Sequence, residues 1–458
     1  MNIGNGLLRF FQAICRYNFG AFEKEEFKKF LKMGLIFALI IGVYWTLRPL
    51  KDAIFIQMVD KYQLPLAKTV SVLTLLPLVM FYTKLIGKYS REKMLVILPT
   101  FYGITIFLFS LLMFKVQDQI SVFPWLFSRS IGYFWYLFVE SFGSLVVALF
   151  WAFATDSTNP SSAKKGFPLV VAIGQMGGIL FPFAVGGLPH RLQCTTDALS
   201  MILLSVFTLA IIPLIRFLIA STPKNLMTAY REEVKEESEP GFLEGLKLLL
   251  KNRYLLGIFA ANFIYEVVIT IFDFNFKIAA SSAYSGVALS HYLSLYGSSV
   301  NIVSLFCLLF GISNVTRFLG VGVALAAMPI IVGGALLGFL SLNSLTFLFA
   351  LMVGSKAINY ALNGPALKQL YIPTSPGVKF KAQAWVETFG SRSSKQVGSL
   401  FNMTLAPLQK TMGVIAGRGH YLMLSGAICF PLLGLWLIIA IFLGKKFNRA
   451  VKHETIVC

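Results

Sequence analysis

The chain has 458 residues, of which 57% are hydrophobic and only 13% are charged. A soluble domain of this size needs far more polar surface, so the composition excludes an ordinary soluble enzyme or binding module. The formal net charge of +20 at pH 7 would indicate nucleic-acid binding in a soluble protein. In a membrane protein, excess Lys and Arg in cytoplasmic loops explains it, and no nucleic-acid partner is expected.

Apolar runs of about 20 residues recur along the chain, each long enough to cross a hydrocarbon core roughly 30 Å thick. We predict an all-α polytopic membrane protein with about 12 transmembrane helices, because a helix satisfies its own backbone hydrogen bonds in lipid. The predicted spans are 31–57, 66–87, 94–114, 130–154, 166–188, 198–220, 254–277, 289–311, 317–340, 343–366, 382–406 and 421–444. The eleventh span is polar enough that a simple hydropathy window would miss it.

A long hydrophilic segment divides the predicted spans into two sets of six. The sequence therefore predicts an N-terminal cytoplasmic segment (1–30), two six-helix halves (31–220 and 254–444), a cytoplasmic linker (221–253) and a cytoplasmic tail (445–458). Two segments, 159–174 and 375–390, align at a constant offset that matches Pro160 with Pro376, Lys165 with Lys381, and Gly174 with Gly390. A parallel repeat of two six-helix halves is typical of major-facilitator-like transporters, whose halves rock around a central site.

Positive charge follows the same organisation. Lys and Arg gather before the first span, in the connections after the second, fourth and tenth spans, and after the twelfth. Cytoplasmic connections carry this excess, so both termini are expected in the cytoplasm.

The seventh span carries polar residues three or four positions apart, which places them on one helix face. They are Asn262, Glu266, Thr270, Asp273 and Lys277. A charged side chain at mid-bilayer costs roughly 2.5–3.5 kcal/mol on insertion scales, so such a series indicates a water-filled cavity. An alternative for Lys277 is a position at the outer membrane edge, where its side chain snorkels to water.

Other predicted spans repeat this pattern. The residues concerned are Tyr44, Arg48, Lys51 and Asp52 in the first, Gly132, Tyr136, Glu140 and Ser144 in the fourth, Lys356, Asn359 and Asn363 in the tenth, and Gln383, Glu387, Ser391 and Lys395 in the eleventh. Cations facing a cavity suit an anionic solute, because Arg and Lys both bind phosphate and carboxylate groups. Pro49 is expected to kink or break the first helix there.

Structural readings of the same charges stay open. Asp52 could simply neutralise Arg48 one helical turn away, and Glu140 and Glu266 could each belong to an interhelical ion pair that only holds the fold. The sequence lacks the GxxxxGK[ST] and HExxH motifs, its four His are dispersed, and its five Cys lack metal-ligand spacing. Neither an enzyme, a metal site nor a cofactor is therefore expected.

Several of these motifs resemble the ATP/ADP translocase family of obligate intracellular bacteria and plastids. The resemblance rests on RPLKD (48–52), ESFGSLVVALFWAFATD (140–156), the seventh-span glutamate and LKQLYIPTSPGVKFKAQAW (367–385). It implies that Lys51, Glu140, Glu266 and either Lys381 or Lys368 are the charges needed for transport. This chain has Pro49 where the family has its first aspartate, and Ile269-Thr270 where the family has a Trp-Lys pair, so a less charged solute stays open.

The sequence thus predicts a multi-pass transporter of the bacterial inner membrane that exchanges ATP and ADP by alternating access. The expected substrate-binding residues are Arg48, Lys51, Lys277, Lys356, Lys381, Asn262 and Asn359. The expected coupling or ion-pair residues are Asp52, Glu140, Glu266, Asp273 and Glu387. The alternatives are a proton-coupled importer of another nucleotide, NAD or an organic phosphate anion, and a membrane scaffold that does not transport.

Overall fold

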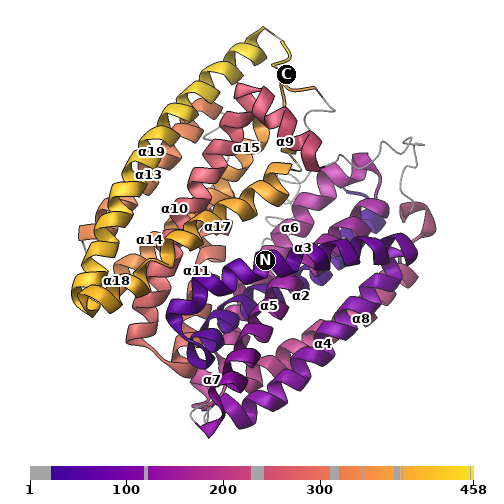
Figure 1. The fold of residues 1–458 in the computed structure, drawn as a ribbon. Helices are drawn as coiled ribbons and strands as arrows, with labels where there is room; N and C mark the ends of the chain where they lie inside the picture. The colour runs from indigo at the N-terminus through magenta and orange to yellow at the C-terminus, as the bar shows by residue number, and fades with distance from the viewer. Residues whose placement is uncertain are drawn as a thin grey trace, which may run out of the picture. The chain divides into compact units, whose positions relative to one another are not determined.

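The computed structural model describes residues 22–117, 122–227, 242–309, 319–341, 344–375, 382–383, 385–453 and 455–457. Throughout these ranges the chain forms helices and no strand (Figure 1). Ten helical segments of the described chain are long and apolar enough to cross a membrane. The predicted all-α polytopic class is therefore confirmed.

The membrane-crossing segments follow the predicted order. Their helices are α2 (Lys24–Met58), α3 (Leu64–Lys88), α4 (Arg91–Val116), α5 (Trp125–Asp156), α6 (Pro160–Phe181), α8 (Ala198–Ser221), α10 (Arg253–Ala283), α13 (Val321–Ser341), α14 (Leu345–Ile358) and α19 (Val414–Lys452). The eighth and eleventh predicted spans correspond to α11 (Gly286–Leu309) and to η6 (Val386–Gly390) with α17 (Ser391–Asn402). Both are helical as predicted.

Short elements join the long helices. They are η1 (Lys61–Gln63), η3 (Pro182–Gly186), α7 (Leu188–Arg191), η4 (Lys224–Leu226), α9 (Phe242–Lys251), η5 (Asn359–Asn363), α15 (Gly364–Gln369) and α18 (Leu405–Met412). Two of them, η3 and η5, are π-helical turns, and so is η6. Such turns are rare in proteins, and those that occur often lie at functional sites.

Pro49 is expected from the sequence to kink or break the first helix, and the predicted break is wrong. α2 runs without interruption from Lys24 to Met58 and contains Pro49. Its neighbours Leu47 and Leu50 are fully buried. Tertiary packing of this kind compensates for the one backbone hydrogen bond that a proline removes from a long helix.

The chain divides into two compact units that exchange one segment each. The first unit comprises Met1–Ile54, Leu75–Glu233 and Gly286–Ser298, and the second comprises Phe55–Thr74, Val234–Ser285 and Ser299–Cys458. The amino-terminal part of α3 therefore belongs to the second unit, and the amino-terminal part of α11 belongs to the first. These helices correspond to the second predicted span of each half, so the exchange is reciprocal.

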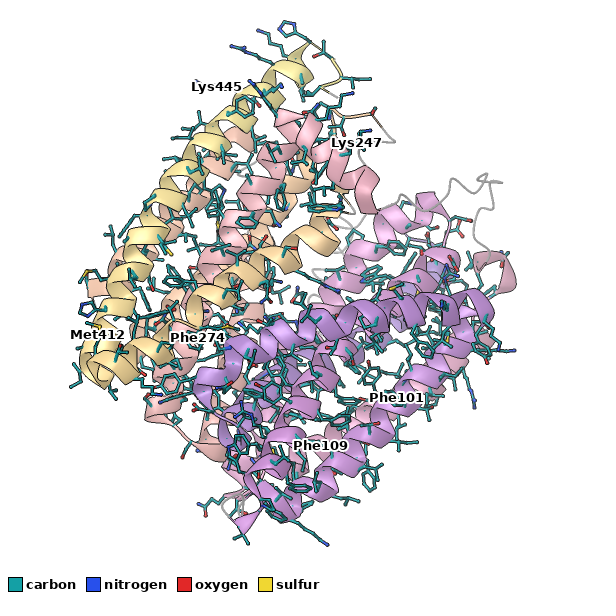
Figure 2. All side chains as sticks on the ribbon, viewed as in Figure 1. Phe101, Phe109, Lys247, Phe274, Met412 and Lys445 are labelled. Carbon is teal, nitrogen blue, oxygen red and sulfur yellow. The ribbon has the colours of Figure 1, made fainter. Side chains whose placement is uncertain are left out.

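Aromatic packing and close helix crossings organise the first unit. The ring of Phe109, which is labelled in Figure 2, stacks on Trp135 with centroids 4.5 Å apart and joins α4 to α5. The Ser205 hydroxyl of α8 donates a 2.8 Å hydrogen bond to the Gly103 carbonyl oxygen of α4. Phe101, on α4, is 56% exposed, as expected for an apolar side chain that faces lipid.

The second unit is built around α10, whose side chains from Val267 to Ile278 are all buried. A chain of buried polar groups fastens this helix to α17 and α19. The Asn275 amide donates to the Tyr421 hydroxyl (3.3 Å), and that hydroxyl donates to Asn402 Oδ1 (2.6 Å). Asn402 Nδ2 in turn donates to the Thr270 carbonyl oxygen (3.2 Å). Because every link is buried and paired, this network fixes the mutual register of the three helices.

Candidate transport site

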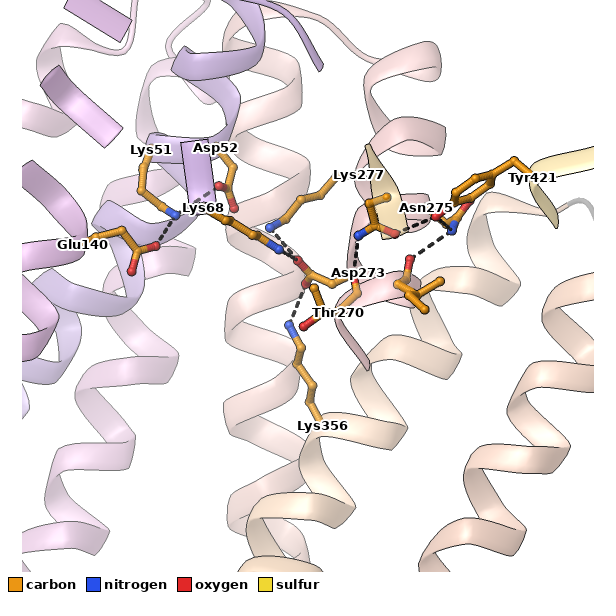
Figure 3. A network of polar contacts seen from close by, with 12 residues as sticks. Lys51, Asp52, Lys68, Glu140, Thr270, Asp273, Asn275, Lys277, Lys356 and Tyr421 are labelled. Atoms are coloured by element: carbon orange, nitrogen blue, oxygen red, sulfur yellow. Dashed lines mark hydrogen bonds and ion pairs between the residues drawn. The ribbon is translucent and has the colours of Figure 1, made fainter. Parts of the chain in front are cut away.

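The first charged group of the site lies in the first unit, where α2 and α5 meet. Lys51 Nζ lies 2.5 Å from Glu140 Oε1 and 3.2 Å from Asp52 Oδ1 (Figure 3). The same ammonium group stands 3.8 Å from the centroid of the Tyr136 ring, a cation–π contact. Arg48 lies near enough to interact electrostatically with Lys51 and Glu140. We call Arg48, Lys51, Asp52 and Glu140 the Lys51 cluster.

A glycine allows this approach of α5 to α2. A Cβ atom at Gly143 would overlap the Tyr44 ring, so the missing side chain lets the two helices come close one turn after Glu140. Lys51 and Asp52 are each only 3% exposed, while the Glu140 side chain is 35% exposed. Glu140 and Arg48 are thus the partly exposed members of the cluster, while Lys51 and Asp52 are buried.

The second charged group lies in the second unit and centres on one carboxylate. Lys277 Nζ lies 2.6 Å and Lys68 Nζ 3.5 Å from Asp273 Oδ2, while Lys356 Nζ lies 2.7 Å from Asp273 Oδ1 (Figure 3). These side chains come from α10, α3 and α14. We call Lys68, Asp273, Lys277 and Lys356 the Asp273 cluster.

Lys277 is buried within this cluster. The residue is 7% exposed and pairs with Asp273 one helical turn earlier. The spacing of the seventh span thus identified a true contact, and the Lys277 side chain is held by that contact instead of extending freely to water.

Glu266 lies one to two turns before Asp273 on α10 and has partners from α17. The Ser391 hydroxyl donates a 3.0 Å hydrogen bond to Glu266 Oε1, and Lys395 Nζ lies 3.6 Å from the same oxygen. Gly398 permits this contact, since a Cβ atom there would lie 2.9 Å from Thr270 Cβ and from the Val267 carbonyl oxygen. Glu266 and Asp273 share the predicted helix face but have different partners. Glu266 contacts residues of α17, whereas Asp273 contacts the three lysines.

Asn262 and Glu387 line a small pocket among α10, α15 and η6. The pocket has a volume of about 190 Å³, and Lys368 also lines it. Glu387 accepts a 2.9 Å hydrogen bond from Gln383 Nε2. Ligand pockets are typically about 300–1,000 Å³, so this pocket is too small for a whole nucleotide.

Asn359 lies on the π-helical turn η5, just after Lys356. Its Oδ1 accepts a 2.8 Å hydrogen bond from Asn363 Nδ2. Asn359 and Glu387 thus both sit on π-helical turns. Lys381, the remaining predicted substrate contact, lies outside the described residues.

The spacing arguments missed Lys68 and a buried polar network around Asp197. Lys68 stands near the start of a predicted span, where a lysine is usually interfacial, so only its contact with Asp273 reveals its place. Asp197 accepts hydrogen bonds from Gln117 Nε2 (2.8 Å) and from the Ser290 hydroxyl (2.7 Å). Across the described part of the chain, no group of three or more His, Cys, Asp or Glu could hold a metal ion.

Solved structures of membrane transporters share this fold. The chain is similar to a mutant form of the nucleoside transporter NupG, with a TM-score of 0.62, 13% identity, and coverage of 90% of this chain and 99% of that chain. It is also similar to a bacterial homologue of the human lysosomal transporter Spinster, with a TM-score of 0.58, 14% identity, and coverage of 94% and 99%. Because the sequence identities are only 13% and 14%, these similarities establish the major-facilitator-like fold alone.

Curated relatives match along almost the whole chain. ADP,ATP carrier protein 1 of Rickettsia prowazekii is 23% identical over 482 residues, which covers 94% of this chain and 96% of the relative. ADP,ATP carrier protein 3 of Rickettsia bellii is 22% identical over 491 residues, with coverage of 94% and 96%. The model of the TLC ATP/ADP transporter family matches residues 9–447. The resemblance predicted from the motifs is confirmed, and the chain belongs to the TLC ATP/ADP transporter family.

Proposed function

We propose that this protein exchanges ATP and ADP across the inner membrane of a bacterium by alternating access. The observation that carries the proposal is the convergence of three lysines on one buried carboxylate within the membrane-crossing helices of a TLC-family chain. Buried cations in a membrane span are costly and mark a substrate or ion pathway. A nucleotide phosphate chain is the solute that such cations suit best.

In the Lys51 cluster, Arg48 and Lys51 are proposed to bind phosphate, and Asp52 and Glu140 to act in coupling by pairing with these cations when no substrate is bound. Its two cations and two carboxylates are formally neutral together, so this cluster needs no counterion when no substrate is bound. Neutralisation lowers the cost of reorienting an unloaded transporter across the bilayer. Glu140, whose side chain is partly exposed, is the carboxylate of the cluster that we propose a proton would reach.

Glu266 is proposed as a second coupling carboxylate, held by Ser391 and Lys395. Asn262, Asn359, Glu387 and Lys381 remain proposed site residues of the same half. We propose the two halves 31–220 and 254–444 as the repeat, with both termini in the cytoplasm, as the distribution of Lys and Arg indicates.

The partly exposed side chain of Glu140 favours one second candidate, a proton-coupled importer of another nucleotide, NAD or an organic phosphate anion. Uptake of radiolabelled ATP, ADP, GTP and NAD by intact Escherichia coli expressing the protein separates the two. Exchange predicts uptake that survives a proton uncoupler and rises with internal counter-substrate. Proton coupling predicts that the uncoupler abolishes uptake. Confirmed membrane insertion without any uptake would favour the scaffold alternative.

A further inference from the structure

We propose that the Asp273 cluster binds the phosphate groups of the substrate, and that the Asp273 carboxylate is an internal anion which those phosphates displace. The inference rests on the proposed function and adds Lys68 to the residues that contact substrate. It also gives Asp273 a role opposite to that of the lysines around it.

The charges of the two clusters differ. Three lysines and one aspartate give the Asp273 cluster a formal charge of +2. The Lys51 cluster, with two cations and two carboxylates, has a formal charge of zero. An incoming anion is therefore attracted more strongly to the Asp273 cluster.

The excess positive charge is unfavourable for folding. Asp273, Lys277 and Lys356 are each less than a tenth exposed, and a buried charge is tolerated only when it is well paired. Lys277 and Lys68 both approach the same oxygen, Asp273 Oδ2, which brings two ammonium groups close together. A second anion would relieve this repulsion, so the arrangement is better suited to binding than to stability.

Lys68 provides the route into the cluster. Its side chain is 25% exposed, and its 3.5 Å distance from Asp273 Oδ2 is the longest of the three. A hydrogen bond of 2.5 Å from Gln396 Nε2 to Thr69 Oγ1 holds this part of α3 against α17. Phosphate oxygens would thus meet Lys68 first and then replace Asp273 as the partner of the two buried lysines.

This exchange of partners predicts selectivity for phosphate number. Three lysines released from Asp273 carry three positive charges, which a diphosphate or triphosphate matches better than a monophosphate. Lys makes point-charge contacts with phosphate, so affinity should rise steeply from AMP to ADP and ATP. The nucleoside part contributes little to this difference.

Binding of inorganic pyrophosphate and of ADP to the purified full-length protein in detergent tests the proposal. Lys68→Gln and Lys356→Gln should each weaken binding by about ten- to hundredfold, the equivalent of one lost charge-assisted hydrogen bond. Asp273→Asn should tighten binding by about tenfold, because no carboxylate competes for the lysines. Lys84→Gln, on the exposed part of α3, is the matched control and should bind as the wild type does.

Two results would overturn the proposal while leaving nucleotide transport intact. One is a wild-type protein that exchanges nucleotides while the lysine variants keep their affinity for pyrophosphate. The other is a folded Asp273→Asn variant that binds more weakly, which would make the carboxylate a structural partner. If Asp273→Asn does not fold, Asp273→Glu replaces it. That variant retains the competing charge and should bind as the wild type does, and the affinities of the lysine variants for pyrophosphate then test the proposal. Absence of nucleotide exchange by the wild type would instead refute the proposed function.

Discussion

The Ser290 hydroxyl donates a 2.7 Å hydrogen bond to Asp197 Oδ2, and both groups are buried. Ser290 lies at the start of α11, and Asp197 stands just before α8 in the same unit. A ring stack of His190 on His291, with centroids 4.6 Å apart, supports the same contact. This part of α11 is therefore fastened to the first unit by polar as well as apolar contacts.

Removal of the Ser290 hydroxyl should loosen that attachment. We expect Ser290→Ala to destabilise the protein by about 1–3 kcal/mol, because it removes a donor from a buried carboxylate. Thermal unfolding in detergent measures the effect. Ser130→Ala is the control, since that hydroxyl donates to the backbone of its own helix; equal effects of the two substitutions would contradict the expectation.

Asp197 should also confer a pH dependence on stability. Burial raises the pKa of Asp197, although hydrogen bonds from Gln117 and Ser290 oppose the shift. The folded state therefore retains a proton that the unfolded state releases near the usual Asp value of about 3.9. The contribution of Asp197 to the free energy of unfolding should therefore fall as the pH rises from about 3.9 to the raised pKa of the folded state. Asp197→Asn should remove this component of the profile, and an unchanged slope in the variant would refute the assignment.

Lys51 should matter more for stability than Glu140. Lys51 pairs with both Asp52 and Glu140, so Lys51→Gln leaves two carboxylates without their shared cation. Glu140→Gln leaves Lys51 still paired with Asp52. Breaking a fully buried pair costs about 3–5 kcal/mol, and we expect Lys51→Gln to approach that range and Glu140→Gln to cost clearly less. Unfolding temperatures of both variants check the order, and the reverse order would contradict the pairing.

The crossing of α17 over α10 should depend on Gly398. Alanine there would place a Cβ atom 2.9 Å from Thr270 Cβ, and overpacking of this kind typically costs about 1–3 kcal/mol. An added side chain would push α17 away from α10 and so lengthen the hydrogen bond from the Ser391 hydroxyl to Glu266. Gly434→Ala on α19 is the control, because nothing lies within 4 Å of its Cβ position. Similar unfolding temperatures for both variants would show that the crossing tolerates a side chain.

Periodicity in the sequence predicted which residues share a helix face, and several contacts followed from it. Lys277 pairs with Asp273 one turn away, and Tyr136 and Glu140, one turn apart, both contact Lys51. Contacts between helices distant in sequence could not be predicted in this way. The pairing of Lys68 with Asp273 depends on the amino-terminal part of α3 belonging to the second unit, which spacing along the chain does not encode.

Pro49 illustrates a second limit. A proline removes one backbone hydrogen bond, and this local rule predicted a kink or a break near the charged residues of α2. The helix continues because its buried neighbours hold it in place, and such packing is known only once the fold is known. The reciprocal exchange of α3 and α11 segments between the units has the same origin, since it depends on tertiary contacts.

The most direct test of nucleotide exchange is counter-transport in proteoliposomes that contain the purified protein. Vesicles loaded with ADP and matched vesicles without nucleotide are each given radiolabelled ATP outside, at equal pH on both sides. Exchange predicts rapid uptake of ATP into the loaded vesicles and almost none into the empty ones. Equal uptake into both, or uptake that requires an imposed proton gradient, would contradict it.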